Sequence, residues 1–352
     1  MLTDEAKVIP GPEPAQAPPS SPGCSVCAVT ITYGMREQLL RPVLLALLKE
    51  PSVWKIVVVS NAARWDVRVL ASELAPGRIE VLEMGSNRGS SAAYAAGIKR
   101  ACEVGTDFIW LLDDDNEPQE GALSELLSAH GRLNEEFPRD KLAVFGFRPL
   151  HHQDILTGWY RRRRPSSFWS FHVFDTPYKL WRRARRLRPR MRRALPFSVE
   201  MGEGPFGGLL FHRAVVERHG LPREDFVLYA DDLEFTYRIS SDGGALRLVP
   251  SAALADLDLA WPADRRFGRG IYAWLVMSSD ARVFYGARNQ SYLDSHCYPH
   301  NRLMFWINRR VFCLVLWVLA LVSRRTGRYR LVQSAIRDGL EGHLGVRPEY
   351  PL

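Results

Sequence analysis

Apolar runs alternate with amphipathic stretches along the first part of this chain. The runs rich in Val, Ile and Leu predict strands at 26–32, 54–60, 79–84, 108–113 and 142–147. Apolar residues at helical spacing predict helices at 37–49, 67–74, 92–103 and 120–133. Because strands and helices alternate, we expect an α/β fold with a mostly parallel sheet, flanked by helices, and a ligand crevice at the carboxyl ends of its strands.

An acidic triplet stands at the end of the fourth predicted strand. The apolar run 108–112 stops at Asp113, Asp114 and Asp115. In an extended chain the first and third of these carboxylates point the same way, so they can share one divalent cation, which prefers oxygen ligands. An acidic surface loop after a core strand would produce the same pattern, so the rest of the chain must decide between the two interpretations.

Other predicted strands end in polar, flexible turns, at 32–34, 60–62 and 85–91. The third turn precedes a helix, so its backbone N–H groups, together with Arg88, can hold a phosphate-bearing ligand. The turn matches neither the Walker pattern nor GxGxxG, which argues against a P-loop ATPase and a simple dinucleotide oxidoreductase. Loops at strand ends are also polar because they are solvated, so this turn alone does not establish a ligand site.

A second apolar segment, 226–230, also ends in carboxylates. Asp231, Asp232 and Glu234 open a predicted helix at 233–239, where the helix N-terminus favours negative charge. An N-terminal cap needs one acid, and three are present. Upstream, Gly207 and Gly208 interrupt the apolar run 205–211, as is typical where the backbone approaches a ligand closely.

The composition fits a folded chain with one strongly basic segment. The chain has 352 residues, 46% of them hydrophobic, and a net charge of +8. Residues 161–193 contain twelve Arg, one Lys and one Asp, a net charge of +12, which leaves −4 for the remainder. The aromatic residues of this segment are Phe168, Trp169, Phe171, Phe174, Tyr178 and Trp181. Such a segment is suited to an anionic membrane surface, with nucleic-acid binding and a solvated basic loop as alternatives.

The two ends of the chain differ from its middle. Residues 1–23 hold six Pro and lack the apolar core of a signal peptide, so we expect a disordered tail. Near the other end, the apolar stretch 311–322 is shorter than the roughly 20 residues of a transmembrane helix and is flanked by Arg on both sides. It predicts an interfacial or re-entrant helix, with a buried core helix as the alternative. Five Cys without repeated spacing favour a reducing compartment.

Several motifs in a fixed order carry a resemblance to a known family. They are VTITYGMREQLLRPVLLAL, NRGSSAAYAAGIKRA, WLLDDDNEP, FGGLLFHR followed by VLYADDLEFTYRI, and a late FYGARN. On these motifs the chain resembles glycosyltransferase family 2 over roughly residues 28–293, and within it the bacterial enzymes that build cell-surface glycans by rhamnosyl or galactofuranosyl transfer. The resemblance implies a GT-A-type fold, with a nucleotide-binding sheet followed by a C-terminal helical region that associates with a membrane.

The resemblance also implies roles for single residues. Asp113 and Asp115 match the carboxylates that hold Mn²⁺ or Mg²⁺ against the diphosphate of a UDP- or dTDP-sugar. Asp232 matches the general base, with Asp231 and Glu234 as neighbours that orient the acceptor or the base. The residues expected to contact the nucleotide or sugar are Thr32, Tyr33, Asn61, Asn87, Arg88, Asp114, Gly207 and Gly208.

The chain departs from the family at the third metal ligand, which is commonly a His after the general base. No His stands there in this chain, and Asp256 is the expected replacement, with Asp258 and His296 as alternatives.

The predicted organisation is a tail at 1–23, a catalytic domain at 24–255 with an Arg/aromatic insertion at 155–200, and a membrane-associated region at 256–352. We expect an inverting, metal-dependent hexosyltransferase that moves galactofuranose or rhamnose to a polyprenyl-diphosphate-linked or cell-surface glycan. It would act in cell-wall polysaccharide biosynthesis, as a peripheral or monotopic protein on the cytoplasmic face of the membrane. Nucleic acid is not an expected partner, and the oligomeric state is not predicted. The alternatives are a sugar-phosphate nucleotidyltransferase and a non-catalytic module that binds polyanions.

Overall fold

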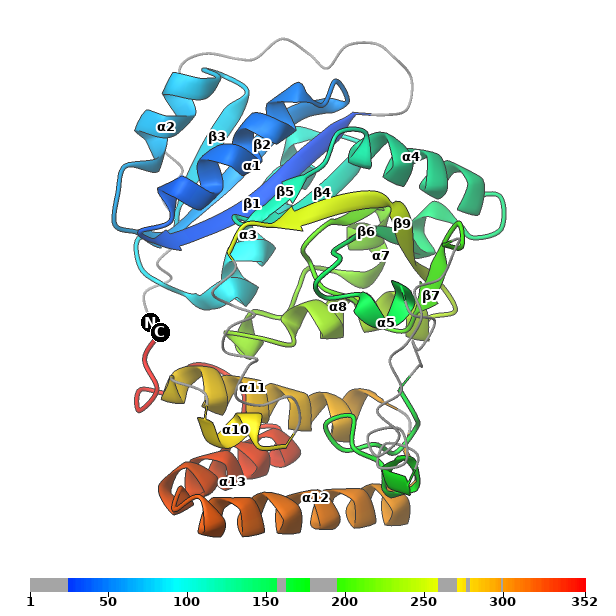
Figure 1. Cartoon of the computed structure of the whole chain (residues 1–352). Helices are drawn as coiled ribbons and strands as arrows, with labels where there is room; N and C mark the ends of the chain where they lie inside the picture. The colour runs from blue at the N-terminus through cyan, green and yellow to red at the C-terminus, as the bar shows by residue number, and fades with distance from the viewer. Residues whose placement is uncertain (1–24, 157–162, 178–194, 259–270, 277–278, 299) are drawn as a thin grey trace. The chain divides into compact units, whose positions relative to one another are not determined.

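The computed structural model describes residues 25–156, 163–177, 195–258, 271–276, 279–298 and 300–352 (Figure 1). These residues form two compact units. Unit 1 contains the described residues up to 153, together with 195–224 and 232–258. Unit 2 contains the others, namely 154–177, 225–231 and 271–352 within the described ranges. The predicted tail at 1–23 lies outside the described residues.

The helices and strands follow one another as drawn in Figure 1. The first half of the chain contains β1 (Val26–Gly34), α1 (Glu37–Lys49), β2 (Val53–Ala63), α2 (Val67–Leu74), β3 (Ile79–Glu83), α3 (Gly89–Val104), β4 (Phe108–Asp113), β5 (Asn116–Pro118), α4 (Ala122–Leu133), η1 (Arg139–Lys141), β6 (Leu142–Phe147), α5 (Gln153–Leu156) and η2 (Val173–Asp175). The second half contains β7 (Val199–Met201), β8 (Leu209–His212), α7 (Ala214–His219), η3 (Glu224–Phe226), α8 (Asp231–Ser241), β9 (Ala245–Asp256), α10 (Ala273–Val276), α11 (Asp280–Tyr292), η5 (Leu293–Cys297), α12 (Arg302–Val322) and α13 (Thr326–Glu341).

The sheet of unit 1 has the strand order β3-β2-β1-β4-β8-β6-β9-β5, and β7 pairs with β9. The predicted parallel arrangement is confirmed for β3, β2, β1 and β4. The second half of the sheet is mixed, because β8 runs antiparallel to both of its neighbours, β4 and β6. The carboxyl ends of β1, β2 and β4 therefore lie along one edge, where the polar turns predicted from the sequence follow the strands.

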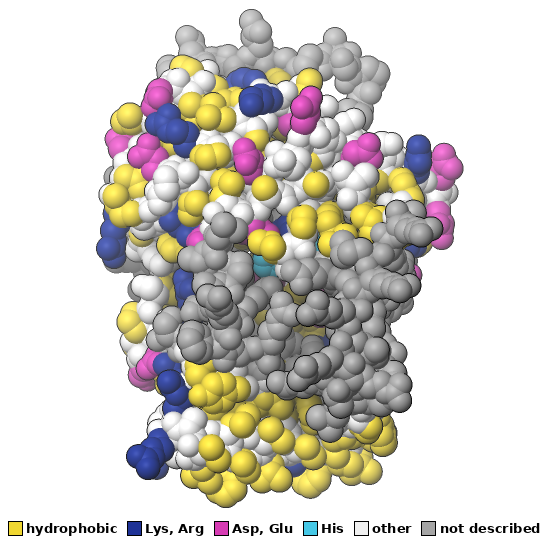
Figure 2. All heavy atoms as spheres, in the orientation of Figure 1, with side chains coloured by type: hydrophobic (Ala, Val, Ile, Leu, Met, Phe, Trp, Pro, Cys, Tyr) yellow, Lys and Arg dark blue, Asp and Glu magenta, His cyan; other side chains and the backbone are white. Residues whose placement is uncertain are grey.

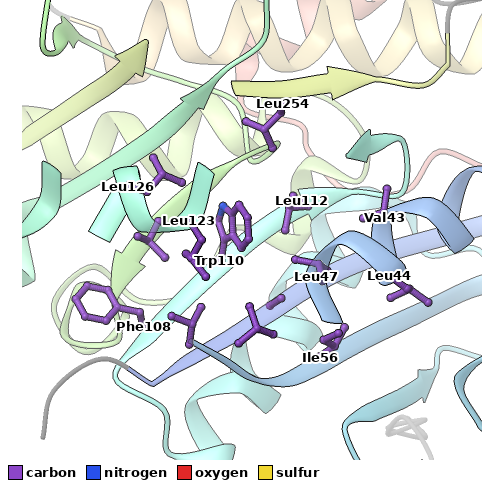
Figure 3. Packing of buried hydrophobic residues seen from close by; sticks show 14 of the residues in the cluster. Val43, Leu44, Leu47, Ile56, Phe108, Trp110, Leu112, Leu123, Leu126 and Leu254 are labelled. Carbon is purple, nitrogen blue, oxygen red and sulfur yellow. The ribbon is translucent and has the colours of Figure 1, made fainter. Parts of the chain in front are cut away.

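Helices cover both faces of this sheet. On one face α1, α2 and α4 enclose a core that includes Trp110 and Leu112 of β4 (Figures 1 and 3). Successive strand residues point to opposite faces, so Val29 of β1 and Val59 of β2 face the other way. There α3 packs so closely that a Cβ on Gly97 would lie 2.5 Å from Val29 and 3.0 Å from Val59. The α/β class predicted from the sequence is confirmed.

His130 of α4 is a buried imidazole whose titration should make stability depend on pH. Its ring packs edge-on against Phe108, with 4.9 Å between ring centroids, and burial lowers its pKa to about 4. In the unfolded chain the pKa is about 6.5. As the pH falls below that value the unfolded chain takes up a proton that the folded protein binds only near pH 4. We expect this residue to remove about 2 kcal/mol of the free energy of unfolding between pH 7 and pH 5.

Urea unfolding of the wild type and of His130→Leu at both pH values would measure this effect. The variant should lose less stability than the wild type on going from pH 7 to pH 5, whatever its stability at pH 7. An unchanged pH dependence would contradict the prediction. The comparison between the two proteins subtracts the contribution of other buried histidines, among them His152.

In unit 2, α11, α12 and α13 share an apolar core with a short aromatic segment. Phe168 and Trp169 belong to this core, with ring centroids 5.3 Å and 5.0 Å from that of Phe312. The interpretation of these two aromatic residues as membrane anchors is wrong, because α12 offers them a protein surface to pack against. Phe174 is exposed. Tyr178, Trp181 and most of the arginines of the segment lie outside the described residues.

The helix α12 is longer than the predicted apolar stretch 311–322. It begins at Arg302, where the side chain of Asn301 caps it by accepting a hydrogen bond from the N–H of Met304 at 3.1 Å. Within the described residues, α12 is the one helix whose length and composition would suffice to cross a membrane.

Candidate functional site

The acidic triplet stands at the carboxyl end of β4, in the middle of the sheet. The strand ends at Asp113, and Asp114 and Asp115 form a turn before β5 begins. The alternation expected for an extended chain therefore stops at Asp113. The carboxylate of Asp113 is the most exposed of the three, and its Oδ1 accepts a hydrogen bond from the hydroxyl of Tyr94 at 2.7 Å. Tyr94, on α3, thus fixes the direction of this carboxylate.

Asp114 is buried and fully engaged by two residues of the β1 end. Its oxygens accept hydrogen bonds from Thr32 Oγ1 at 2.9 Å and from Arg36 Nε at 2.9 and 3.0 Å. Burial raises the pKa of Asp114, and the hydrogen bonds of Arg36 and Thr32 oppose that rise. The remaining nitrogens of Arg36 reach Asp115 at 3.3 Å and Asp258 at 3.0 Å. Arg36 therefore joins three carboxylates, and sequence reasoning gave it no role in the site.

Asp115 has a strongly perturbed carboxyl group. Burial, together with the negative charges of Asp113 and Asp114, raises its pKa to about 7, and the positive charges of Arg36 and Arg148 only partly oppose this rise. Such a site favours any added positive charge, since a cation stabilises all the carboxylates at once.

The structure brings Asp256, the proposed third metal ligand, next to the triplet. β5 and β9 pair so that Asn116 stands opposite Asp256, with Asn116 Nδ2 3.4 Å from Asp256 Oδ1. The same oxygen accepts a hydrogen bond from Arg148 Nε at 2.7 Å, and Arg148 Nη1 lies 3.6 Å from Asp113 Oδ2. Arg148 was not predicted, although it directly follows the end of β6. His296 belongs to unit 2, where its ring stacks on Tyr292 at 4.4 Å.

Two buried oxygens at this place accept no hydrogen bond, Asn116 Oδ1 and Asp256 Oδ2, although His151 Nε2 lies 3.7 Å from the second. A buried polar atom without a hydrogen-bond partner calls for an explanation, and an ion that binds there is one such explanation. The carboxylate and amide oxygens are the hard donors that Mn²⁺ and Mg²⁺ prefer. Within the part of the chain that the structure describes, no three His, Cys, Asp or Glu side chains are already grouped around a metal position. Ligation by Asp113, Asp115 and Asp256 therefore stays a prediction that the donor types fit.

Of the two predicted glycines, Gly207 lies directly against this acidic site. A Cβ on Gly207 would overlap Asn116 Oδ1, and would stand 2.7 Å from Arg148 Nη1 and 2.8 Å from Asp113 Oδ2. Gly208 adopts a φ of +92°, which favours glycine, and its N–H donates to the carbonyl of Leu111 at 2.8 Å. The backbone of this loop therefore forms one wall of the site.

The same loop connects the triplet with the second acidic cluster. At its start, Gly204 donates its N–H to Thr236 Oγ1 of α8 at 2.9 Å. Phe206 packs against Tyr94, at 4.5 Å between centroids, and against Phe235 of α8, at 5.9 Å. Because Tyr94 holds Asp113, an unbroken series of contacts runs from the triplet to α8.

The acidic residues of the second cluster open α8, as predicted. Asp231 and Glu234 are buried, and Asp232 is partly buried. Oδ1 of Asp232 accepts a hydrogen bond from the N–H of Leu233 at 2.8 Å, and Glu234 lies 3.2 Å from Arg238. Asp232 thus combines a fixed carboxylate with access to solvent.

The remaining predicted contacts form two groups at neighbouring strand ends. At β1, the exposed ring of Tyr33 lies 5.1 Å from the guanidinium of Arg36. At β2, Asn61 accepts a hydrogen bond from the N–H of Arg88 at 2.9 Å and donates to Asn87 Oδ1 at 3.0 Å. The two asparagines therefore shape the turn before α3, and the guanidinium of Arg88 extends toward Glu224 at 3.5 Å.

In unit 2, the FYGARN motif supports the segment that leads into α8. Val227, Tyr229 and Ala230 have φ values of 66°, 67° and 63°, which are unfavourable for side-chain-bearing residues. Asn289 Nδ2 donates to the carbonyls of Phe226, Leu228 and Tyr229 at 2.7 to 2.9 Å. Arg288 also binds the Phe226 carbonyl, at 3.1 Å, and its burial lowers its pKa to about 10.

Comparison with known families decides what kind of protein carries this site. The sequence profile described as glycosyl transferase family 2 matches residues 27–208, just over half of the chain. The chain belongs to glycosyltransferase family 2.

Two similar proteins extend the comparison. Over 107 residues the chain is 35% identical to galactofuranosyltransferase GlfT1 of Mycolicibacterium smegmatis, a match that covers 29% of this chain and 34% of that relative. The chain thus spans about a third of the length of the curated relative it matches. A solved structure of GalNAc-T7 with UDP, GalNAc and Mn²⁺ is 12% identical, with a TM-score of 0.49, over 66% of this chain and 44% of that one.

Proposed function

We propose that this chain is an inverting, metal-dependent hexosyltransferase that moves galactofuranose or rhamnose from a UDP- or dTDP-sugar to a glycan carried on polyprenyl diphosphate. The observation that supports the proposal is the link that Asn116 and Arg148 make between Asp115, Asp256 and Asp113, beside Asn116 Oδ1, which accepts no hydrogen bond. The relative named as a galactofuranosyltransferase favours galactofuranose over rhamnose. A lipid-linked acceptor implies action at the cytoplasmic face of a membrane, in polysaccharide biosynthesis for the cell wall.

The first acidic cluster serves the leaving group in this proposal. Asp113 and Asp115 would hold a Mn²⁺ or Mg²⁺ ion, with Asp256 as third ligand. The ion would supply positive charge to the diphosphate, on which negative charge develops as the glycosidic bond breaks. Tyr94 keeps Asp113 in position through its hydroxyl. Asp114 stays with Thr32 and Arg36 and supports the donor sugar indirectly.

The second cluster serves the acceptor. Asp232 takes the proton from the attacking sugar hydroxyl, which is otherwise a poor nucleophile. Attack opposite the diphosphate inverts the anomeric carbon in one step, so no covalent enzyme intermediate is needed. Asp231 and Glu234 orient the acceptor or the base. The loop with Gly207 and Gly208 contributes a wall without side chains beside Asp113, on which the sugar can rest.

Nucleotide contacts divide between side chains and backbone. Tyr33 offers an exposed ring to the base, and Arg88 with the N–H groups of the turn before α3 faces the phosphates. Asn61 and Asn87 act by fixing that turn, because their amides already bond within it.

Calorimetric titration with UDP, in the presence and absence of Mn²⁺, tests the proposal. Since the diphosphate and the carboxylates repel each other without a cation, we expect Mn²⁺ to tighten UDP binding at least about tenfold. Asp115→Asn should remove most of that gain. Equal UDP affinity in EDTA and in Mn²⁺ would contradict metal dependence. Incubation with a series of nucleotide sugars, followed by detection of released nucleoside diphosphate, identifies the donor.

A further inference from the structure

The helix α12 of unit 2 has two apolar faces with different surroundings. One face is buried by the unit itself, through Phe305, Asn308, Phe312, Leu316 and Ala320. The opposite face is exposed, and Figure 2 shows hydrophobic side chains gathered over this helix. Its exposed apolar residues are Leu303, Trp306, Leu314, Val315, Trp317, Val318, Leu321 and Val322. A contiguous apolar face of this kind, with two Trp, indicates a binding partner.

Positive charge borders this apolar face at both ends. Residues 301–337 contain eight Arg and no Asp or Glu. Arg302 stands at the beginning of α12, Arg309 and Arg310 lie in its first half, and Arg324 and Arg325 follow its end. Arg310 lies within the exposed face, with its guanidinium 5.2 Å from the ring of Trp306. An apolar strip framed by arginines complements the acyl chains and the phosphates of an anionic lipid layer.

The packing of α13 decides how α12 would lie in such a layer. At about 1.5 Å per residue α12 is long enough to span the hydrocarbon core. However, Val332 and Ala335 of α13 share its buried core, so the two helices move together. α13 carries the exposed charged residues Arg330, Arg337 and Glu341. A spanning α12 would draw these charges into hydrocarbon, which is costly, whereas an α12 that lies flat leaves them in water.

We infer that the exposed face of α12 docks on the anionic leaflet of a membrane, with the helix axis in the membrane plane. Trp306, Trp317 and Leu321 enter the interfacial layer, and Arg310 binds lipid phosphate. A second copy of this chain is a poor alternative occupant, because two acid-free helices would place arginines against arginines in either orientation. This inference deepens the proposed function, since it names the surface on which the lipid-linked acceptor would be met.

Co-sedimentation with vesicles tests the inference on the full-length protein. The vesicles contain phosphatidylcholine, with or without phosphatidylglycerol. Because Trp317→Glu/Leu321→Glu places two charges in the apolar face, it should lower the partition coefficient at least about tenfold. Arg310→Glu should weaken binding to the anionic vesicles and leave binding to neutral ones unchanged. Val69→Glu, at an exposed apolar position on α2, is the matched control and should bind like the wild type.

Each outcome has a defined meaning. Extraction of the wild type from membranes by alkaline carbonate supports the in-plane helix, and resistance to extraction would overturn it in favour of a span. Unchanged binding of the double variant would overturn the assignment of this face. A dimer of the wild type that the double variant loses would assign the face to a second copy instead. Hydrolysis of the soluble donor is measured for every variant and should not change, so failure of docking is distinguished from failure of the glycosyltransferase proposal.

Discussion

Asp232→Asn should lower the rate of sugar transfer by roughly 10²- to 10⁴-fold, the usual contribution of a general base. The amide has the shape of the carboxylate and keeps an oxygen that can accept the hydrogen bond from the N–H of Leu233. Only the capacity to take a proton is lost. The expected signature is a reduced kcat with unchanged affinity for UDP and Mn²⁺, measured by release of nucleoside diphosphate and by calorimetry.

Asp242→Asn is a suitable control for this substitution. Asp242 is a carboxylate of unit 1 just beyond the end of α8, where it pairs with Arg218 at the surface. Exposed pairs contribute little to stability, so the control should transfer sugar at the wild-type rate. Full turnover by Asp232→Asn would refute the assignment of the base. Asp231→Asn and Glu234→Gln would then identify which neighbour takes the proton.

The strand that carries the triplet was predictable because periodicity and burial act locally. The run 108–112 is apolar because both faces of β4 are covered, and the strand ends where charge begins. The bounds of α1 and α2 were also predicted, since their apolar residues recur at helical spacing. Asp256 was chosen by its place in the family pattern, and the pairing of β5 with β9 brings it beside the triplet.

The arginines of the site were not predictable in the same way. Arg36 and Arg148 each follow a strand, but a single cation in a turn has no periodic signal. Their importance comes from partners far away in the sequence: Arg36 binds Asp114 and Arg148 binds Asp256. The available signal was their position at the carboxyl ends of β1 and β6, which is where an α/β sheet gathers its ligand-binding groups.

The sequence alone also could not distinguish residues that face a membrane from residues that form the protein core. Phe168 and Trp169 lie among arginines in the sequence, yet they pack against Phe312. Conversely, Arg309 and Arg310 interrupt the apolar run, so the sequence predicted only the stretch 311–322. The helix α12 continues through both arginines and begins at Arg302. Apolar side chains suit a bilayer and a protein core equally, and only tertiary structure separates the two.

Gly207→Ala should lower sugar transfer by about 10²-fold, the order of loss that a displacement of about 1 Å causes in an active site. The new methyl group would overlap Asn116 Oδ1 and crowd Asp113 Oδ2. These atoms are the ends of side chains, so they can move aside and spare the fold, but the geometry of the acidic site changes. The measurement is kcat together with the affinity for Mn²⁺ and UDP, and with the melting temperature as a check on folding.

Gly202→Ala provides the matched comparison for that variant. Gly202 precedes the same loop, and no atom lies within 4 Å of the position that its Cβ would occupy. The same chemical change should therefore leave both transfer and metal binding unaltered. If Gly207→Ala transferred sugar as fast as Gly202→Ala, the wall formed by this backbone would have no part in placing Asp113. If both variants lost activity equally, mobility of the loop would matter more than its distance from the carboxylates.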